Sequence, residues 1–483
     1  GAGETLTVTV SGATYTVTPD GSGNWSVDLD TATPSSGSLT PLAEGSYSVV
    51  ATIDDGAGNL TSDATNGELV IDTTAPATAP TVATDTAATT TPVITGTATV
   101  ATGDTLTVTI SGATYTVIPD GSGNWSVDLA TATPSTGTLT ALTDGNTYEV
   151  TATITDEAGN STSDISSGEI TIDTSAPSPA PTIDTLIADN TTPTLTGTAT
   201  VGAGETLTVT VSGATYTVVP TGTSWSLDLA TATPSSGTLI ALTDGNTYEV
   251  TATVTDGAGN AASDSSSNEL TIDTSAPSPA PTITTQTANS TTPTISGTAT
   301  VGAGETLTVT VSGATYTVTP TGTSWSLDLA TATPSSGTLI ALTDGNTYEV
   351  TATVTDGAGN AASDSSSNEL TIDTSAPSPA PTITTQTANS TTPTISGTAT
   401  VGAGETLTVT VSGATYTVIP DGSGNWSVDL ATATPSSGSL TALVDGNTYE
   451  VTATVTDGAG NATSDGSSNE LTIDTSAPSP APT

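Results

Sequence analysis

Acidic and amide side chains carry almost all of the chemistry that this sequence offers. The chain has 48 Asp and Glu residues and no Lys, Arg, His or Cys, so its formal net charge is −48. Carboxylates without cationic neighbours suit calcium, which takes about six to eight oxygen ligands. Nucleic acid and anionic membranes both require basic side chains to neutralise them. The composition therefore favours calcium as a partner and excludes nucleic acid, and we expect no membrane insertion within this segment.

Catalysis has few candidate residues. No His, Cys or Lys is present to act as base, nucleophile or Schiff-base former, and a serine without a basic partner is inert. A pair of carboxylates can hydrolyse glycosides, but it needs a cleft in which burial keeps one of them protonated. Nothing in the pattern indicates such a cleft, so we predict that the chain is not an enzyme.

The acidic residues recur because the whole chain is a repeat. The block GETLTVTVSGATYTV, or its close variant GDTLTVTISGATYTV, begins at Gly3, Gly103, Gly204, Gly304 and Gly404. Between residues 204–303 and 304–403 the only difference is Val219 against Thr319. Five near-identical copies in series add length rather than a new active site, which favours a length-setting role.

Each repeat reads as a succession of β-strands, because apolar and polar residues alternate with period two. Seven strands with turn signals between them are typical of an immunoglobulin-like sandwich. The fold class predicted is all-β, a tandem array of seven-stranded sandwiches forming an extended rod. In the third repeat the expected strands are A at 194–201, then B to G centred on Val209, Tyr216, Leu227, Leu239 with Leu242, Val250, and Leu270 with Ile272.

Two aromatic positions per module are interpreted as structural. The single Trp (Trp25, Trp125, Trp225, Trp325 and Trp426) is in phase with the inward residues that follow it, which favours the core over a sugar-stacking platform. Tyr248 follows the turn Asp244-Gly245-Asn246-Thr247, where a tyrosine corner would tie the hydroxyl back to the main chain.

Proline-rich linkers separate the modules. After Ile272-Asp273-Thr274 the chain reads SAPSPAP, which should form a short, semi-rigid spacer because Pro fixes φ. The predicted modules are residues 1–74, 80–175, 181–275, 281–375 and 381–476, with 477–483 starting another linker. Gly1 corresponds to Gly202, so the first module lacks its strand A. We interpret the ends as cuts from a longer protein; donation of strand A by another molecule is the alternative.

Strand parity places calcium candidates at the junctions between modules. The end of one strand G should face the F–G loop of the next module, which brings Asp273 toward Asp356, Asn360 and Asp364. Two carboxylates at about 4 Å repel by roughly 4 kcal/mol at an effective dielectric of about 20, and a divalent cation would relieve that repulsion. Solvated turn residues are the alternative for any one of them; Asp344 should repeat the arrangement, whereas Glu249 and Asp228 are interpreted as solvated. The full candidate set is Asp72, Asp156, Asn160, Asp164, Asp173, Asp256, Asn260, Asp264, Asp273, Asp356, Asn360, Asp364, Asp373, Asp457, Asn461 and Asp465.

Three segments carry a resemblance to a known family. They are the loop Thr255-Asp256-Gly257-Ala258-Gly259-Asn260, the linker 272–277 and the turn Gly123-Asn124-Trp125. In these the chain resembles the bacterial Ig-like extender repeats of giant surface adhesins, many of them exported by type I secretion. The resemblance implies calcium-stiffened domains, on the bacterial cell surface, that hold a binding region away from the cell. The chain contains none of the Gly-Gly-x-Gly-x-Asp nonapeptides of many such proteins, which leaves the export route open.

Two other functions remain open on the sequence. One is a carbohydrate-binding array that uses the Trp, which Trp exposure would reveal. The other is a surface filament or layer, in which copies of the chain associate laterally or end to end through edge strands.

Overall fold

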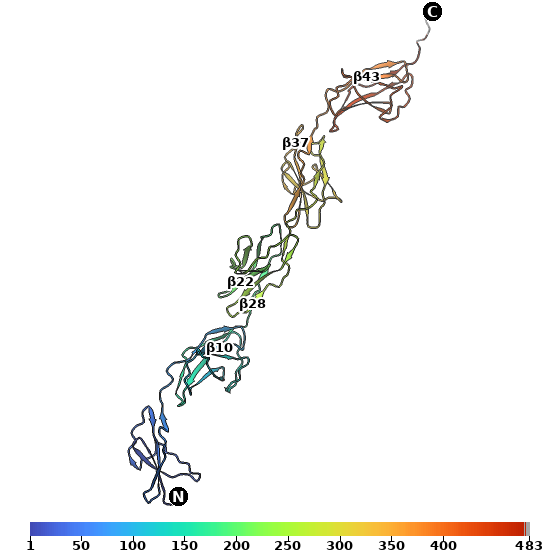
Figure 1. Ribbon diagram of the computed structural model, residues 1–483. Helices are drawn as coiled ribbons and strands as arrows, with labels where there is room; N and C mark the ends of the chain where they lie inside the picture. The colour runs from blue at the N-terminus through green and yellow to red at the C-terminus, as the bar shows by residue number, and fades with distance from the viewer. Residues whose placement is uncertain (478, 480–483) are drawn as a thin grey trace. The chain divides into compact units, whose positions relative to one another are not determined.

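The computed structural model describes residues 1–477 and 479, and all 51 regular elements in that part of the chain are β-strands (Figure 1). The second module shows the complete pattern. Its strands are β8 (Thr81–Val82), β9 (Asp85–Ala87), β10 (Val93–Thr97), β11 (Thr105–Ile110), β12 (Ala113–Val117), β13 (Asn124–Asp128), β14 (Thr136–Gly137), β15 (Thr147–Tyr148), β16 (Val150–Thr155), β17 (Ser161–Ser163) and β18 (Ile170–Ile172).

The third, fourth and fifth modules repeat this order with small shifts, and the first module contains only part of it. The first has β1 (Thr5–Val10), β2 (Ala13–Val17), β3 (Ser36–Gly37), β4 (Gly45–Tyr47), β5 (Val50–Asp54), β6 (Leu60–Ser62) and β7 (Leu69–Ile71). The third has β19 (Thr182–Ile183), β20 (Leu186–Ala188), β21 (Thr194–Thr198), β22 (Thr206–Val211), β23 (Ala214–Val218), β24 (Ser224–Asp228), β25 (Ser236–Gly237), β26 (Thr247–Tyr248), β27 (Val250–Thr255), β28 (Ala261–Ser263) and β29 (Leu270–Ile272).

The fourth and fifth modules complete the set. The fourth has β30 (Thr282–Ile283), β31 (Gln286–Ala288), β32 (Thr294–Thr298), β33 (Thr306–Val311), β34 (Ala314–Val318), β35 (Ser324–Asp328), β36 (Ser336–Gly337), β37 (Thr347–Tyr348), β38 (Val350–Thr355), β39 (Ala361–Ser363) and β40 (Leu370–Ile372). The fifth has β41 (Thr382–Ile383), β42 (Gln386–Ala388), β43 (Thr394–Thr398), β44 (Thr406–Val411), β45 (Ala414–Val418), β46 (Asn425–Asp429), β47 (Ser437–Gly438), β48 (Thr448–Tyr449), β49 (Val451–Thr456), β50 (Ala462–Ser464) and β51 (Leu471–Ile473).

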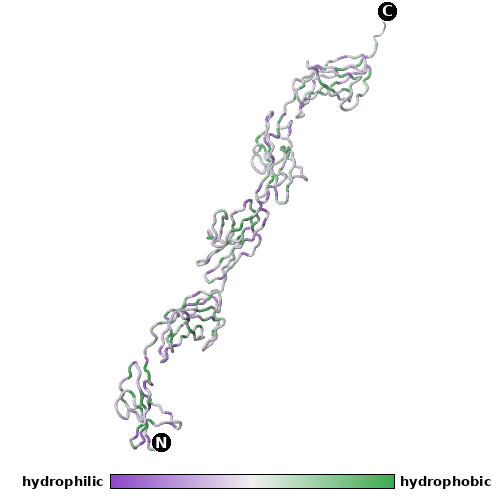
Figure 2. Tube along the Cα trace, in the orientation of Figure 1, coloured by the Kyte–Doolittle hydropathy of each residue, from purple (hydrophilic) through white to green (hydrophobic). Residues whose placement is uncertain are grey.

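The second module contains three sheets. One has the order β14-β12-β11-β16-β17, the second β13-β10-β8, and the third β15-β18-β9. All the pairs are antiparallel except β18 with β9, which is parallel. Figure 2 shows hydrophobic residues interleaved with polar ones along the strands, the alternation that gives each strand one inward face.

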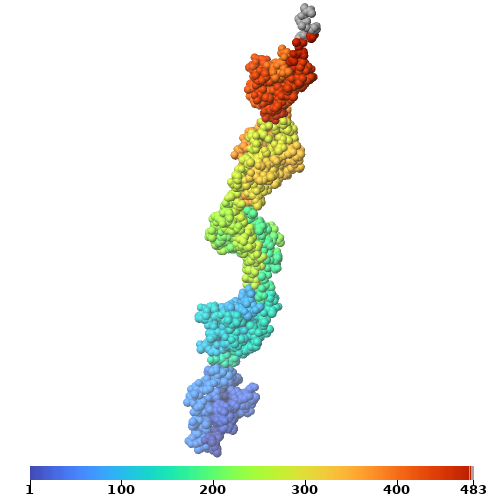
Figure 3. Space-filling model, turned by 90° about the vertical axis from the view of Figure 1, so that its right-hand side faces the viewer, coloured from blue at the N-terminus to red at the C-terminus, as the bar shows by residue number. Residues whose placement is uncertain are grey.

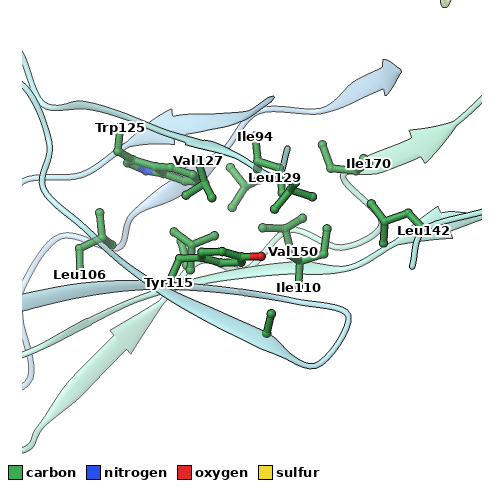
Figure 4. Close-up of a cluster of buried hydrophobic side chains, with 14 of the residues drawn as sticks. Ile94, Leu106, Ile110, Tyr115, Trp125, Val127, Leu129, Leu142, Val150 and Ile170 are labelled. Carbon is green, nitrogen blue, oxygen red and sulfur yellow. The ribbon is translucent and has the colours of Figure 1, made fainter. Parts of the chain in front are cut away.

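Alternate residues of these sheets close a core in the second module. Figure 3 shows this module, in light blue to cyan, as a compact body, and Figure 4 shows its side chains converging between two layers of strands. Its largest members lie on different sheets: Tyr115 on β12, Trp125 on β13 and Ile170 on β18. The interior also contains Ile94, Leu106, Ile110, Val127, Leu129, Leu142 and Val150. The all-β tandem fold expected from the sequence is confirmed.

The strand assignment itself needs three corrections. The expected strand A at 194–201 corresponds to β21, and β19 and β20 precede it. The expected strand at Leu239 and Leu242 does not form, because the main chain there makes only single hydrogen bonds, Thr238 to Gly213 and Ile240 to Ser212. The expected strand F divides into β26 and β27, which belong to different sheets, and β28 forms in addition before the expected strand G, which is β29.

The first module departs further from the expectation. Trp25 is 40% exposed, so the prediction that it is a core residue is wrong, and residues 24–28 form no strand. In the second module the equivalent strand β13 pairs with β10, which in turn pairs with β8. Within the described residues no strand pairs with residues 24–28, so Trp25 lacks the sheet that covers Trp125.

By its internal contacts the chain divides into two units. The first comprises Gly1–Asp184, Thr194–Ile240 and Val250–Ser267, and the second Thr185–Pro193, Ala241–Glu249 and Asn268–Thr483. The described residues include no helix long and apolar enough to cross a membrane. Of the expected linker at 477–483, residues 478 and 480–483 lie outside the described part.

Candidate functional site

The loop Asp-x-x-Gly-Asn after the long strand of each module is shaped by its own side chains. In the fourth module Asp356 Oδ1 accepts the main-chain N–H groups of Ala358, Gly359 and Asn360 at 2.8–2.9 Å. Asn360 Nδ2 donates to Asp356 Oδ2 at 3.0 Å. Gly359 has a φ of 103°, which an L side chain rarely adopts, so this position requires glycine. The sequence therefore builds a rigid loop that orients the asparagine amide.

That amide also reaches the preceding module. Asn360 Nδ2 donates to the main-chain carbonyl of Asp273, the residue after β29, at 2.7 Å. The same hydrogen bond joins Asn160 to Asp72 at 3.0 Å, Asn260 to Asp173 at 2.7 Å and Asn461 to Asp373 at 2.7 Å. We call this repeated contact the junction clasp. At the first junction Thr162 Oγ1 adds a hydrogen bond to the carbonyl of Pro76 at 2.7 Å.

The loop aspartates are held in the charged form. The side-chain hydrogen bond from Asn260, with smaller contributions from main-chain N–H groups, outweighs burial and lowers the pKa of Asp256 from its ordinary 3.8. The same hydrogen bond from the loop asparagine lowers the pKa of Asp156 and of Asp457. Each carboxylate is thus ionised at neutral pH and committed to its own loop.

The aspartate on the other side of the clasp is fixed by main-chain contacts. The N–H of Asp273 donates to the carbonyl of Ala188 on β20 at 2.9 Å. Its Oδ1 accepts the N–H of Ser275 at 3.2 Å. Asp173 and Asp373 have matching contacts, to Ala87 and Ala288. The short strand that the sequence analysis missed is therefore what positions this residue.

The fourth member of each expected ligand group, Asp364 in the fourth module, lies elsewhere. Asp364 follows β39, and its Oδ1 accepts the N–H of Ala352 at 3.0 Å, in the interior of β38. Because the loop begins after Thr355, Ala352 is several residues back along the strand, on the order of 10 Å away. Asp164 and Asp465 make the same contact, to Ala152 and Ala453, and the N–H of Asp264 donates to the carbonyl of Ala252. The structure brings the main-chain carbonyl of Asp273 and the carboxylate of Asp356 to the same Asn360 amide. Asp364 instead braces a strand.

The oxygen ligands at a junction are of the type that calcium prefers, but the acidic side chains described there are too few to complete the coordination. Every candidate ligand is an oxygen, and the sequence has no Lys or Arg to compete for it. Within the described residues, however, no group of three or more acidic side chains lies close enough to hold a metal ion. A junction that supplies two carboxylates would need main-chain carbonyls and water to complete the coordination.

A second contact in each complete module attaches the linker. Asp344 lies in the turn before β37, and its Oδ2 accepts the Ser375 hydroxyl at 2.6 Å while its Oδ1 accepts the N–H of Thr374. The hydrogen bond from Ser375 is the largest cause of a lowered pKa at Asp344. In the first module Glu44 binds the Thr73 and Thr74 hydroxyls instead, at 2.9 and 2.7 Å. We call this contact the linker clasp; in the complete modules the recurring Asp-Gly-Asn-Thr turn was its signal in the sequence.

One buried glutamate per complete module also escaped the sequence analysis. Glu369 is 1% exposed, and its Oε2 accepts the N–H of Val350 at 3.0 Å, where the chain passes from β37 to β38. In return Glu349 Oε2 accepts the N–H of Asn368 at 2.9 Å. Glu169 and Glu470 repeat the first contact with Val150 and Val451. These carboxylates satisfy main-chain groups that the ladder leaves unpaired where strands change sheets. Glu249, expected to be solvated, makes the returning contact to Asn268.

The aromatic predictions hold in the complete modules. Trp125, Trp225, Trp325 and Trp426 are 2–3% exposed, which leaves these indoles no face for a sugar. The hydroxyl of Tyr348 accepts the N–H of Thr343 at 2.8 Å, and Tyr148 and Tyr248 make the same contact to Thr143 and Thr243. The tyrosine corner is confirmed.

Comparisons with known proteins give structural neighbours only. No family model matches the chain, and no curated protein matches it. Among solved structures, the chain is similar to a calcium-stabilised adhesin with which an Antarctic bacterium reaches out and binds ice; the identity is 29%, over 83% of this chain and 100% of that one, with a TM-score of 0.28. It is also similar to part of a 1.5-MDa bacterial ice-binding adhesin, at 26% identity over 61% of this chain and 97% of that one, with a TM-score of 0.24.

A third neighbour is more distant. The eight N-terminal Ig domains of the Down syndrome cell adhesion molecule match at 11% identity over 97% of this chain and 67% of that one, with a TM-score of 0.20. All three TM-scores are too low to support an argument about function. The resemblance to adhesin extender repeats therefore rests on the sequence motifs.

Proposed function

We propose that this chain is a structural extender region of a bacterial cell-surface adhesin, which projects a distal binding region away from the cell. The observation that carries the proposal is the junction clasp, which recurs with the same donor and acceptor at each of the four junctions. A contact repeated so regularly restricts bending at every linker, which is useful to a spacer. We also propose the module boundaries 80–175, 181–275, 281–375 and 381–476, because each range contains one full set of strands.

Small-angle X-ray scattering of the full chain tests this function. Each sandwich should add roughly 40 Å to the longest dimension, from strands of about 3.3 Å per residue and the loops at both ends. We expect the total to approach five module lengths. A variant with Asn160→Ala, Asn260→Ala, Asn360→Ala and Asn461→Ala should be shorter on average and more flexible. A compact particle for the unchanged chain would contradict the proposal.

Calcium is proposed as a weak stiffener of the same junctions. The carboxylates of Asp273 and Asp356, with nearby main-chain carbonyls, would hold it; the ion would supply positive charge between two anionic groups. Since the junction offers few acidic ligands, binding should be in the range of extracellular modules, about 10⁻⁴ to 10⁻³ M. We propose the same role at the other junctions for Asp72 with Asp156, Asp173 with Asp256, and Asp373 with Asp457.

A calcium titration separates this proposal from the clasp alone. Isothermal calorimetry should show binding that Asp273→Asn with Asp356→Asn weakens at that junction, and scattering should show a stiffer chain when calcium is present. Asp228→Asn, in a turn where Asp228 binds Ala230 and Thr231, is the matched control. Identical calorimetry for all three proteins would overturn the calcium proposal and leave the extender proposal standing.

A further inference from the structure

The loop that forms the junction clasp has a second copy in two of the complete modules. Asp120 Oδ1 accepts the N–H groups of Ser122 and Asn124 at 2.8 and 2.9 Å, and Asn124 Nδ2 donates to Asp120 Oδ2 at 3.1 Å. Asp421, Ser423 and Asn425 repeat these contacts in the fifth module. The sequence Asp-Gly-Ser-Gly-Asn thus folds with the hydrogen bonds of the clasp loop. In the third and fourth modules a shorter turn replaces it, with Thr221 paired to Ser224 and Thr321 to Ser324.

The two kinds of loop differ in what the asparagine amide contacts outside its loop. Asn160 Nδ2 donates to its own Asp156 and to the carbonyl of Asp72. Asn124 Nδ2 donates only to Asp120 within the described part of the chain, and Asn425 only to Asp421. An amide nitrogen has two hydrogens, so the second loop presents an oriented donor suited to a main-chain carbonyl.

An apolar side chain and a cavity lie beside this donor. Ile118 follows β12 and is 90% exposed, and Ile419 in the fifth module is 91% exposed. A cavity of about 620 Å³ lies between the loop Ala98–Asp104 and the segment Pro119–Gly123. A similar cavity of about 530 Å³ is present in the fifth module. Ile118 also borders two further hollows, one reaching Trp125 and one reaching Tyr115. Ile118 also lines the cavity of about 620 Å³, and Ile419 that of about 530 Å³, so each presents apolar surface to whatever occupies it.

The main chain next to Ile118 is open as well. Strand β12 pairs with β14 only at Ala113 and Thr114, and the carbonyl of Thr114 accepts the N–H of Ser135 on that side. Because main-chain groups alternate along a strand, those of Thr116 face the same side, where β12 has no further partner in the described residues. An unpaired edge of this kind is a template for an added strand.

The acidic residues that line these cavities determine which kind of added strand the open edge can bind. Asp104 and Asp120 line the cavity of the second module, and Glu405 and Asp421 that of the fifth. The chain carries −48 formal charges and no Lys, Arg or His, so a second copy of it would be repelled. We propose that the second and fifth modules each bind an extended basic polypeptide segment along β12 or β45. Its main chain pairs with Thr116, one carbonyl accepts from Asn124, an apolar side chain covers Ile118, and a Lys or Arg meets Asp104 and Asp120.

Binding of a short peptide to the full chain tests this proposal. The probe is a peptide of alternating threonine and valine with a lysine at each end, and its control has glutamate at each end. Isothermal calorimetry should give about two lysine peptides per chain, with affinity falling as salt rises, and no binding of the glutamate peptide. A stoichiometry of four or five, or equal binding of both peptides, would overturn the proposal.

Substitutions that introduce the residues found at the equivalent positions of other modules locate the site without disrupting the fold. Asn124→Ser with Asn425→Ser introduces the residue found at Ser224 and Ser324, and Ile118→Thr with Ile419→Thr introduces that of Thr319. Each pair should weaken the lysine peptide at least about tenfold with an unchanged melting temperature. Attraction to the acidic surface in general would survive both pairs and refute the proposal. Sedimentation that shows a dimer competing with the peptide would replace the basic partner with a second copy.

Discussion

The first and second modules share the ten residues DGSGNWSVDL and yet fold them differently. In the second module residues 124–128 form β13, and Trp125 is 3% exposed. In the first module residues 24–28 form no strand, and Trp25 is 40% exposed. The loops before the two Trp residues are alike, since Asp20 binds Ser22 and Asn24 as Asp120 binds Ser122 and Asn124. Local sequence therefore sets the turn, whereas the strand depends on a partner.

That partner is the segment from Thr81 to Thr97. Gly96 on β10 lies opposite Trp125, and β8 pairs with Gly96 from the other side. Strand propensity is largely a property of packing against neighbours, so the same five residues lose their strand where β10 and β8 have no counterpart. The comparison agrees with the proposed module boundary at residue 80, which lies well before the repeated block at Gly103.

Substituting the two Trp residues should give the largest difference between these modules. Trp125→Ala should destabilise the second module by about 3–5 kcal/mol, because it opens a cavity in a packed core. Trp25→Ala should cost about 1 kcal/mol or less in the first, because that side chain is largely in water already. Hydrogen exchange of peptides from each module, followed by mass spectrometry in increasing urea, measures both. Equal losses would mean that the two indoles have the same surroundings.

Adding a side chain at Gly96, which lies against the Trp125 ring, should have the next largest effect on the stability of the second module. A Cβ at Gly96 would lie 2.0 Å from the carbonyl oxygen of Thr81 and 2.4 Å from the Trp125 ring. Gly96→Ala should therefore separate β8 from β10, at a cost of about 3 kcal/mol. Gly121→Ala is the control, because a Cβ there meets nothing within 4 Å. If exchange in the second module responded to neither change, the close approach of β8 would not support that core.

Substituting the glutamate that is buried in the second module and exposed in the first should give a smaller difference in stability between the two modules. Glu169 is 1% exposed and accepts the N–H of Val150, whereas its counterpart Glu68 is exposed and accepts the N–H of Val49. Glu169→Ala should cost about 1–2 kcal/mol, since it leaves a buried N–H without a partner but also removes a carboxylate oxygen with none. Glu68→Ala should leave the urea midpoint of the first module unchanged. The reverse order would show that burial does not determine the strength of this brace.

Acid should loosen the linker clasps of both modules to a small and similar extent. Hydrogen bonds from Ser175 and Thr174 lower the pKa of Asp144, and those from Thr74 and Thr73 lower that of Glu44. A lowered pKa adds stability above the ordinary value, 3.8 for Asp and 4.5 for Glu, and that stability is lost as the pH falls through the folded value. The protection factors of the linker amides, which correct for the intrinsic pH dependence of exchange, should thus stay constant above roughly pH 5 and fall below roughly pH 4. A dependence that Asp144→Asn leaves intact would exclude this carboxylate as its source.

The sequence was sufficient for features that repeat locally. Alternating Thr and Val predicted β11 and β16, and the turn before Tyr248 predicted its corner hydrogen bond. The sequence was insufficient where the role of a residue depends on a contact with another residue far along the chain. Strand β20, which pairs in parallel with β29, is too short to stand out, and Glu369 is polar, so nothing in period two marks it as buried. Strand parity paired Asp273 with the loop at Asn360, but it could not show that Asp364 is engaged with Ala352.

The central claim is that the junction clasp fixes the geometry between adjacent modules. A distance measurement across one junction tests this claim most directly. The chain has no cysteine, so Ser336→Cys and Ser437→Cys, both at exposed positions in adjacent modules, provide two unique sites for spin labels. Double electron–electron resonance should give a narrow distance distribution, and Asn461→Ala should broaden it by removing the hydrogen bond to Asp373. A distribution that is equally broad with and without Asn461 would contradict the claim that this hydrogen bond fixes the junction.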